Sequence, residues 1–243
     1  MTTSKSASMH KDVAIQRAYY ADTAENYDAR HLAESGEHVF ALHFMMSAME
    51  HFGFRSILDI GSGTGRALTT LREKMPHVSA TGVEPSQELR KIGYAKGLSD
   101  TQLIDGDGMN LTFANGSFDV VCEFGVLHHV PEPNKVVAEM LRVARKAIFI
   151  SDSNNFGQGS KVSRFAKQAV HAAGLWPLAN LVKTRGKQYS ISEGDGLYYS
   201  YSVFNNYKQI AARCESVHVL NTTNGGVNPY RSASHVALLG ILR

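Results

Sequence analysis

The stretch Ile57–Gly65, Ile-Leu-Asp-Ile-Gly-Ser-Gly-Thr-Gly, decides the fold of this chain. An apolar run ends in an acid, and three alternating glycines then lead into a segment of helical character from Arg66. Glycines here permit a tight turn and a close approach of the backbone to a ligand, and the first N–H groups of the helix stay free to bind it. The stretch therefore predicts a strand at 56–60, a ligand-binding turn, and a helix at 66–74.

Strand and helix patterns alternate after this turn. Strands are predicted at 78–83, 102–104, 118–122 and 147–151, and helices at 87–95, with Ser86 as its N-cap, and at 134–143. Such alternation indicates βαβ units in a parallel sheet with right-handed crossovers. Outside this region, helical patterns are predicted within 12–52 and at 161–173, and strands at 216–221 and 235–242.

The composition suits a single α/β domain with an elaborated end or insert. Of the 243 residues, 43% are hydrophobic and 19% charged, which allows a real core. Cys122 and Cys214 lie far apart and indicate neither a disulfide framework nor a zinc site, and no metal site is predicted. The N-terminus lacks the apolar part of a signal peptide and no run is long enough to span a bilayer, so the cytoplasm is the expected compartment.

Positive charge is unevenly distributed. The net charge is +3, and Asp152 is the single acid among the many Lys and Arg residues of 142–187. A solvated basic face is the ordinary explanation, and an anionic acceptor or an anionic surface is the alternative. The net charge is too small to imply nucleic acid.

Acidic residues follow the ends of neighbouring predicted strands. Glu84 ends the second strand, Asp107 follows the third, and Glu123 follows the fourth. Ligands of open parallel sheets bind along this carboxyl edge, and an acid at the end of the second strand can accept hydrogen bonds from ribose hydroxyls. The ordinary alternatives are a solvated loop carboxylate for Glu84 and turn chemistry for Asp107.

The glycine turn argues against a dinucleotide. The dinucleotide spacing G-x-G-x-x-G fails because Arg66 stands at the last glycine position. Asp59, directly before the turn, would repel a pyrophosphate but would accept a cationic amino-acid group. An NAD(P) oxidoreductase therefore ranks second.

These motifs, together with Leu127-His128-His129, resemble the class I S-adenosylmethionine (SAM)-dependent methyltransferases, in particular the type 11, small-molecule branch. The resemblance covers about Ser56–Ser151. The chain departs from the family pattern at Thr112, often Pro in the family, and in a shortened turn at 142–146. The resemblance implies a Rossmann-like, doubly wound, seven-stranded sheet, mostly parallel with an antiparallel last strand. It also implies an N-terminal tail and cap helices at 1–52, and a SAM-binding domain at 53–243 with a cap insert at about 155–212.

The resemblance further implies which residues bind SAM. The glycine turn and the backbone near Glu123 border the methionine part, Glu84 holds the ribose, and Asp107 with the backbone of Gly108 reads the adenine. The expected cofactor-binding residues are Asp59, Gly61, Gly63, Glu84, Asp107, Gly108 and Glu123.

Methyl transfer requires accurate positioning, and a hydroxyl acceptor also gains from a general base. His128 and His129 follow the fourth strand and Asp152 ends the fifth on the same edge, so these three are the candidate catalytic residues. Packing or helix capping is the alternative role for the histidines. Tyr20, Tyr27 and His31 are further candidates for the base.

The acceptor is predicted from the segment 183–208, where tyrosines accompany Glu193 and Asp195. Aromatic faces with nearby acids suit a sugar or another polar ring. We therefore expect O-methylation of a polar small molecule or of the sugar of a glycoconjugate.

The alternative is a lipid, a quinone-like molecule or another secondary metabolite, favoured by the apolar residues Phe165, Leu175, Trp176, Leu178 and Leu181. A nucleic-acid methyltransferase and a non-catalytic SAM-binding protein rank lower, peripheral membrane contact stays open, and the oligomeric state is not determined.

Overall fold

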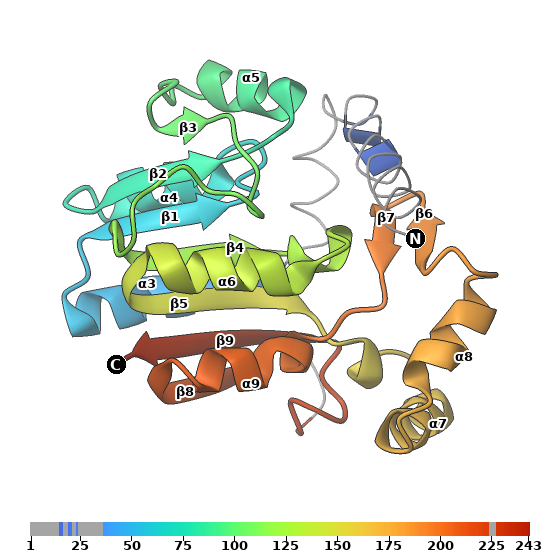
Figure 1. Cartoon of the computed structure of the whole chain (residues 1–243). Helices are drawn as coiled ribbons and strands as arrows, with labels where there is room; N and C mark the ends of the chain where they lie inside the picture. The colour runs from blue at the N-terminus through green and yellow to red at the C-terminus, as the bar shows by residue number, and fades with distance from the viewer. Residues whose placement is uncertain (1–14, 17–18, 21–22, 24–35, 224–226) are drawn as a thin grey trace.

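The computed structural model describes residues 15–16, 19–20, 23, 36–223 and 227–243. Its centre is a seven-stranded sheet in the order β3-β2-β1-β4-β5-β9-β8 (Figure 1). The strands are β1 (Ser56–Ile60), β2 (Ser79–Val83), β3 (Leu103–Ile104), β4 (Phe118–Phe124), β5 (Ala144–Ser153), β8 (Cys214–Asn221) and β9 (His235–Leu242). Strands β1 to β5 pair in parallel, and β9 runs antiparallel to both β5 and β8. The predicted Rossmann-like sheet with an antiparallel last strand is confirmed.

Helices cover both faces of the sheet. They are α3 (Gly36–Phe52), α4 (Arg66–Lys74), α5 (Gln87–Ala95), α6 (Pro133–Val143) and α9 (Tyr207–Ala211). Successive side chains of a strand point to opposite faces. Accordingly Ile57 of β1 packs in a core cluster with α3 and α4, and Leu58 packs in a second cluster with α6 and α9. Both faces of the central strands are therefore buried.

Most of the predicted elements have their predicted positions. The strand at 56–60, the helices at 66–74 and 87–95 and the strand at 235–242 have the predicted bounds. β5 begins at Ala144, immediately after α6. Residues 142–143 of the shortened turn therefore belong to the helix, and residues 144–146 belong to the strand. The predicted helical region 12–52 is described only in part, and Tyr27 and His31 lie outside the described residues.

A segment after β5 lies beyond the carboxyl ends of the parallel strands (Figure 1). It contains η3 (Asn155–Gly157), α7 (Lys161–Ala172), α8 (Trp176–Lys183), and the hairpin of β6 (Tyr189–Ser192) and β7 (Gly196–Tyr199), and it is followed by η4 (Val203–Asn206). The sequence predicted α7, but it predicted neither α8 nor the hairpin. Within the part of the chain that the structure describes, no helix is long and apolar enough to cross a membrane.

Candidate active site

The turn after β1 depends on its glycines. Gly61, Gly63 and Gly65 have φ angles of 65°, 57° and 74°, a backbone conformation that glycine adopts without strain. A Cβ on Gly61 would lie 2.4 Å from Cγ2 of Val126. The Gly61 N–H donates to the carbonyl oxygen of Val83 at 2.8 Å, which ties the turn to the end of β2.

Glu84 holds the same turn from the end of β2. Its Oε2 accepts a hydrogen bond from the Gly63 N–H at 2.9 Å, and its Oε1 accepts one from the Ser86 N–H at 2.8 Å. The residue is only 4% exposed. Burial raises the pKa of this carboxyl to about 7, although the two N–H groups oppose the rise. An incoming hydroxyl donor would favour its charged form.

A cavity lies over the ends of β1, β2 and β4, and we call it the cofactor cavity. Gly61, Glu84, Asp107 and Gly108, all predicted, line it, and so do Phe124, Gly125 and Val126 directly after Glu123. Val83, Leu89, Met109 and Val136 supply an apolar wall that suits a flat ring. A Cβ on Gly108 would lie 2.7 Å from Cγ2 of Ile60, so the space beside this backbone depends on glycine. The cavity therefore offers a carboxylate for a ribose, an apolar wall for a flat ring and a glycine backbone that a ligand can approach closely. This combination fits SAM.

Three of the predicted cofactor residues do not line this cavity. The buried Asp59 accepts a hydrogen bond from Ser62 Oγ at 2.6 Å, and burial raises its pKa to about 6. Gly63 contributes its N–H to Glu84. Glu123 is fully buried and accepts hydrogen bonds from the N–H groups of Val126 and Ser151 at 2.8 and 3.1 Å. All three hold the loops that form the wall, and a direct contact with SAM stays a prediction for them.

The short helix η2 (Leu127–His129) carries both predicted histidines. His128 Nδ1 lies 2.6 Å from Oδ1 of the fully buried Asp152, whose Oδ2 accepts the Leu127 N–H at 2.8 Å. Burial opposes a charge on His128, but the carboxylates of Asp152 and Asp195 outweigh it and hold its pKa well above the ordinary value. Burial likewise raises the pKa of Asp152, and the facing imidazole reverses the effect, so that its pKa is low.

His129, the next residue of η2, lies beside His128. Its Nδ1 lies 2.6 Å from the carbonyl oxygen of Leu197 on β7, and its ring centroid lies 3.9 Å from that of His128. Asp195, in the β6–β7 turn, lies 3.4 Å from His128 Nε2 and 3.3 Å from His129 Nε2. The structure thus brings together His128, His129 and Asp152, and it adds Asp195, which the sequence offered only as part of a polar region.

An N-terminal segment closes one side of the site. Gln16 Oε1 accepts the Leu197 N–H at 2.6 Å, and Tyr19 Oη donates to the Glu193 carbonyl oxygen at 3.0 Å. The ring of Tyr20 meets that of His129 edge-on, with centroids 6.3 Å apart. The sequence pointed to Tyr20 but not to Gln16, because nothing near Gln16 in the chain signals a contact with β7.

A second, polar cavity of about 430 Å³ lies beside the first, and we call it the acceptor cavity. His128, Asp195, Tyr198, Tyr199, His38 and His235 are on its wall. The two cavities meet at η2, since His129 lines the cofactor cavity and His128 the acceptor cavity. Gly125 of the cofactor cavity also adjoins His38, because a Cβ there would lie 3.1 Å from that ring.

The sequence did not point to His38 and His235. Their rings pack edge to face with centroids 4.6 Å apart, and burial lowers the pKa of both. Among the described residues, His38 Nδ1 and His235 Nε2 are buried without a hydrogen-bond partner. His235 is the single histidine of β9 and His38 is one of three in α3, and no local motif distinguishes either from a residue of the core.

Comparisons with known proteins agree with this geometry. The sequence profile of the methyltransferase domain matches residues 58–150. A demethylmenaquinone methyltransferase of Thermotoga maritima is 32% identical over 90 residues, which are 37% of this chain and 39% of that protein. The chain thus matches less than half the length of this curated relative.

Solved structures share the fold over most of the chain. One is a SAM-dependent methyltransferase of Thermotoga maritima, a possible histamine N-methyltransferase, with a TM-score of 0.56 and 19% identity over 93% of this chain and 99% of that one. Another is the plantazolicin methyltransferase BpumL in complex with a triazolic desmethylPZN analog and SAH. It has a TM-score of 0.54 and 17% identity over 100% of both chains. Residues 58–150 therefore match the type 11 methyltransferase domain, and the chain shares the fold of these SAM-dependent methyltransferases.

Proposed function

We propose that this protein transfers a methyl group from SAM to a hydroxyl oxygen of a polar small molecule or of the sugar of a glycoconjugate. The observation that carries the proposal is the polar acceptor cavity, which meets the cofactor cavity at His128 and His129. Its volume of about 430 Å³ is that of a small-molecule site. The proposed compartment is the cytoplasm, in keeping with the free, buried thiols of Cys122 and Cys214.

The residues of the site have distinct proposed roles. SAM, when bound, supplies an activated methyl group. Glu84 and the Gly61 turn hold its ribose and methionine parts, with Asp107 and Gly108 at the adenine. His128 lies on the acceptor wall and, in its neutral form, takes the acceptor's hydroxyl proton at Nε2, while Asp152 orients the ring through its 2.6 Å contact with Nδ1. His129 lines the cofactor cavity and positions the reacting groups.

The cavity wall supports a hydroxyl-rich acceptor. The buried, unpaired nitrogens of His38 and His235 each carry a desolvation cost of about 1–3 kcal/mol. Because these atoms are buried, a polar acceptor would bond instead with polar side chains of the wall, among them Asp195 and Tyr198. The aromatic faces of Tyr198 and Tyr199 suit the flat sides of a sugar ring.

Radiolabel transfer tests the proposal. The full chain is incubated with methyl-labelled SAM and separate panels of sugars, nucleotide sugars, glycolipids, apolar phenols and amines. We expect label only in hydroxyl-bearing polar acceptors, with loss of transfer in His128→Ala. His43→Ala, on the exposed side of α3, is the matched control and keeps activity. Label confined to apolar phenols or amines would refute the acceptor assignment.

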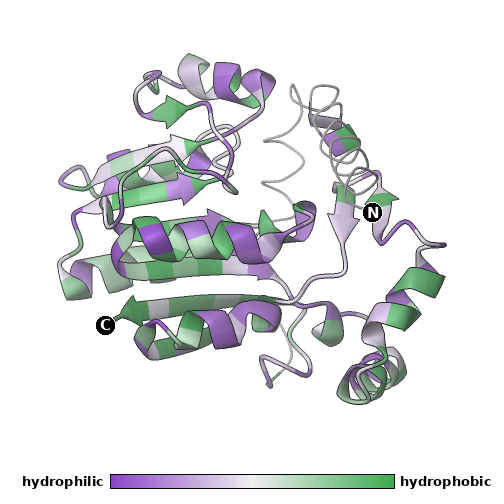
Figure 2. Cartoon of the chain, viewed as in Figure 1, coloured by the Kyte–Doolittle hydropathy of each residue, from purple (hydrophilic) through white to green (hydrophobic). Residues whose placement is uncertain are grey.

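A second candidate acceptor is a glycoconjugate anchored in a lipid surface. Helices α7 and α8 have no buried residue, and Val162, Phe165, Leu178 and Val182 are 79%, 76%, 60% and 72% exposed. Hydrophobic residues lie along α8, which stands apart from the sheet (Figure 2). The nearby cations Lys161, Arg164, Lys183 and Arg185 would complement anionic headgroups.

Vesicle sedimentation tests this second candidate. We expect the protein to sediment with anionic phosphatidylglycerol vesicles and not with neutral phosphatidylcholine. The double variant Leu178→Asp, Val182→Asp should lose binding, whereas Val227→Asp, at a fully exposed position in another loop, should keep it. If the protein sedimented equally with both kinds of vesicle, or with neither, the lipid-anchored acceptor would be refuted. The soluble acceptor alone would then remain.

A further inference from the structure

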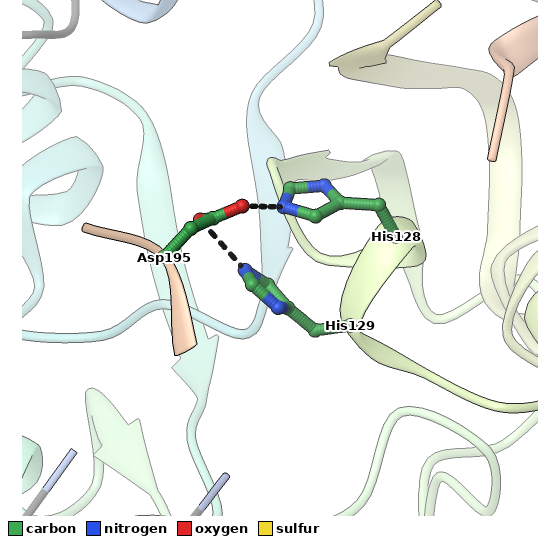
Figure 3. A group of neighbouring side chains, drawn as sticks. All are labelled: His128, His129 and Asp195. Atoms are coloured by element: carbon green, nitrogen blue, oxygen red, sulfur yellow. Dashed lines mark ion pairs between the residues drawn. The ribbon is translucent and has the colours of Figure 1, made fainter. Parts of the chain in front are cut away.

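We propose that His128, His129 and Asp195 bind a divalent transition-metal cation of the Zn²⁺ class where the two cavities meet. The carboxylate of Asp195 lies between the two rings, with Oδ2 3.4 Å from His128 Nε2 and Oδ1 3.3 Å from His129 Nε2 (Figure 3). One ligand atom from each of the three residues lies within 4.8 Å of the others. Imidazole nitrogen and carboxylate oxygen are ligands that Zn²⁺ and its neighbours in the transition series accept.

The two contacts of Asp195, through Oδ2 to His128 and through Oδ1 to His129, each have the separation of two ligands around a tetrahedral ion. A tetrahedral ion with metal–ligand distances of about 2.0–2.1 Å separates its ligand atoms by about 3.3 Å. The contacts of Asp195 with both rings already have this separation. The two rings come from one short helix and the carboxylate from the distant β6–β7 turn, so an ion would join the hairpin to the edge of the sheet.

The outer hydrogen bonds orient both rings for a metal. The Leu197 carbonyl oxygen can only accept, so its 2.6 Å contact requires a hydrogen on Nδ1 of His129. His128 makes the equivalent 2.6 Å contact with the Asp152 carboxylate. A metal cation would replace the proton on Nε2, and each ring, with Nδ1 protonated, would then direct the lone pair of Nε2 toward the ion. Metal-binding histidines show this pattern, in which an oxygen behind the ring fixes the tautomer.

The site also leaves a coordination position open. The side chain of Asp195 is 45% exposed, and both Asp195 and His128 line the acceptor cavity. Three protein ligands with an open fourth position are typical of catalytic rather than structural zinc. A cation here would bind the acceptor hydroxyl and promote transfer of its proton to water, and His128 would then act as a ligand. This use rests on the proposed function, but the binding of the ion does not.

Co²⁺ is the direct probe, because its visible absorption reports the ligand geometry. The full chain is stripped with a chelator, dialysed and titrated with Co²⁺, and Zn²⁺ is then added. We expect saturable tetrahedral Co²⁺ bands that Zn²⁺ abolishes. Asp195→Asn and His129→Ala should weaken binding at least tenfold. Glu193→Gln, in the same turn but outside the ligand set, is the control and should bind like the unmodified chain.

Two further measurements distinguish loss of metal binding from loss of folding. Circular dichroism and SAM calorimetry on each variant establish that it folds and retains the cofactor cavity. Absence of saturable Co²⁺ binding to the unmodified chain, or equal binding by folded Asp195→Asn, would overturn the proposal. Methyl transfer that persists in the stripped protein without Co²⁺ binding would overturn the metal site and leave the proposed function standing. Co²⁺ binding without any acceptor methylation would support the metal site and overturn the proposed function.

Discussion

Glu84 Oε2 lies 2.9 Å from the amide nitrogen of Gly63, so a buried acid at the end of β2 holds the glycine turn after β1. This contact joins two residues that the sequence proposed separately as cofactor ligands. The carboxylate therefore has two roles. It keeps the turn in place, and it offers a hydrogen-bond acceptor to the cofactor cavity. The first two predictions follow from this relationship.

Glu84→Gln should weaken SAM binding about 10- to 100-fold, the size expected when a charged hydrogen-bond acceptor is removed. The amide keeps the shape of the side chain but offers only one acceptor oxygen. Calorimetric titration with SAM and S-adenosylhomocysteine measures the change. Glu88→Gln, on the exposed side of α5, serves as the control. Unchanged affinity in Glu84→Gln, or tight binding of NADH by the unmodified chain, would contradict the assignment.

The affinity for SAM should rise with pH up to about 7 and then level off. Burial raises the pKa of Glu84 to about 7 in the free protein. Hydroxyl donors on the ligand favour the carboxylate and lower that pKa in the complex, so binding releases protons and strengthens as the pH rises toward the pKa of the free protein. Calorimetry in buffers of different ionisation enthalpy counts those protons. Glu84→Gln should show a flatter profile, and an unaltered profile in that variant would exclude Glu84 as the source.

Asp152→Asn should lower kcat by about 10²–10⁴-fold while the affinity for SAM changes little, because the carboxylate acts on His128 and lies outside the cofactor cavity. Steady-state kinetics as a function of pH provides the measurement. A positioning role predicts a shifted pH profile as well as a lower rate. Asp100→Asn, at an exposed position, is the control. A parallel loss of SAM binding and folding would instead indicate a structural role for the bonds to η2.

Gly61→Ala should impair SAM binding and lower the melting temperature. The φ of 65° is unfavourable for alanine, and the added Cβ would lie 2.4 Å from a methyl group of Val126. Gly36→Ala is the matched control, because a Cβ at Gly36 meets nothing within 4 Å. Differential scanning calorimetry with and without SAM compares the two variants. Equal behaviour would show that the turn tolerates a side chain.

Asp119→Asn should destabilise the fold by about 3 kcal/mol, since Asp119 is a buried carboxylate with paired charges. It accepts the Arg55 N–H at 2.8 Å and contacts Arg145 at 2.7 Å. Burial raises its pKa, but these donors outweigh burial and lower it to about 2. The stabilisation is therefore present above the unfolded pKa, near 4, and is lost as the pH falls toward 2. Urea unfolding at pH 7 and pH 3 measures this. Asp105→Asn, in an exposed ion pair, should have a much smaller effect.

The sequence predicted those parts of the protein that depend on neighbouring residues. The strand, glycine turn and helix from Ser56 to Lys74 follow from apolar spacing and glycine conformation alone. Ser86 was predicted as a helix cap from its position, and its Oγ accepts the Leu89 N–H at 3.3 Å. Alternating strands and helices then restricted the topology to a parallel sheet, whose carboxyl edge is the known place for ligands.

The β6–β7 hairpin shows where local pattern was insufficient. Its sequence, Tyr189–Tyr199, mixes tyrosine, serine and glycine without a clear period of two. The strands form because they pair with each other and because Gln16 and His129 bind the backbone of Leu197. Those partners lie far away along the chain, so a local window of sequence does not contain the reason for the hairpin.

The sequence by itself determined the class of sheet, the glycine turn and the acids at its edge, because short-range sterics and hydrophobic periodicity act within a few residues. The tertiary structure alone decided that Asp195 lies between His128 and His129, and that His38 and His235 line the acceptor cavity. Each of these contacts joins separate elements of the chain. Their geometry depends on how the whole core packs, since only packing sets the distance between side chains that no local rule connects.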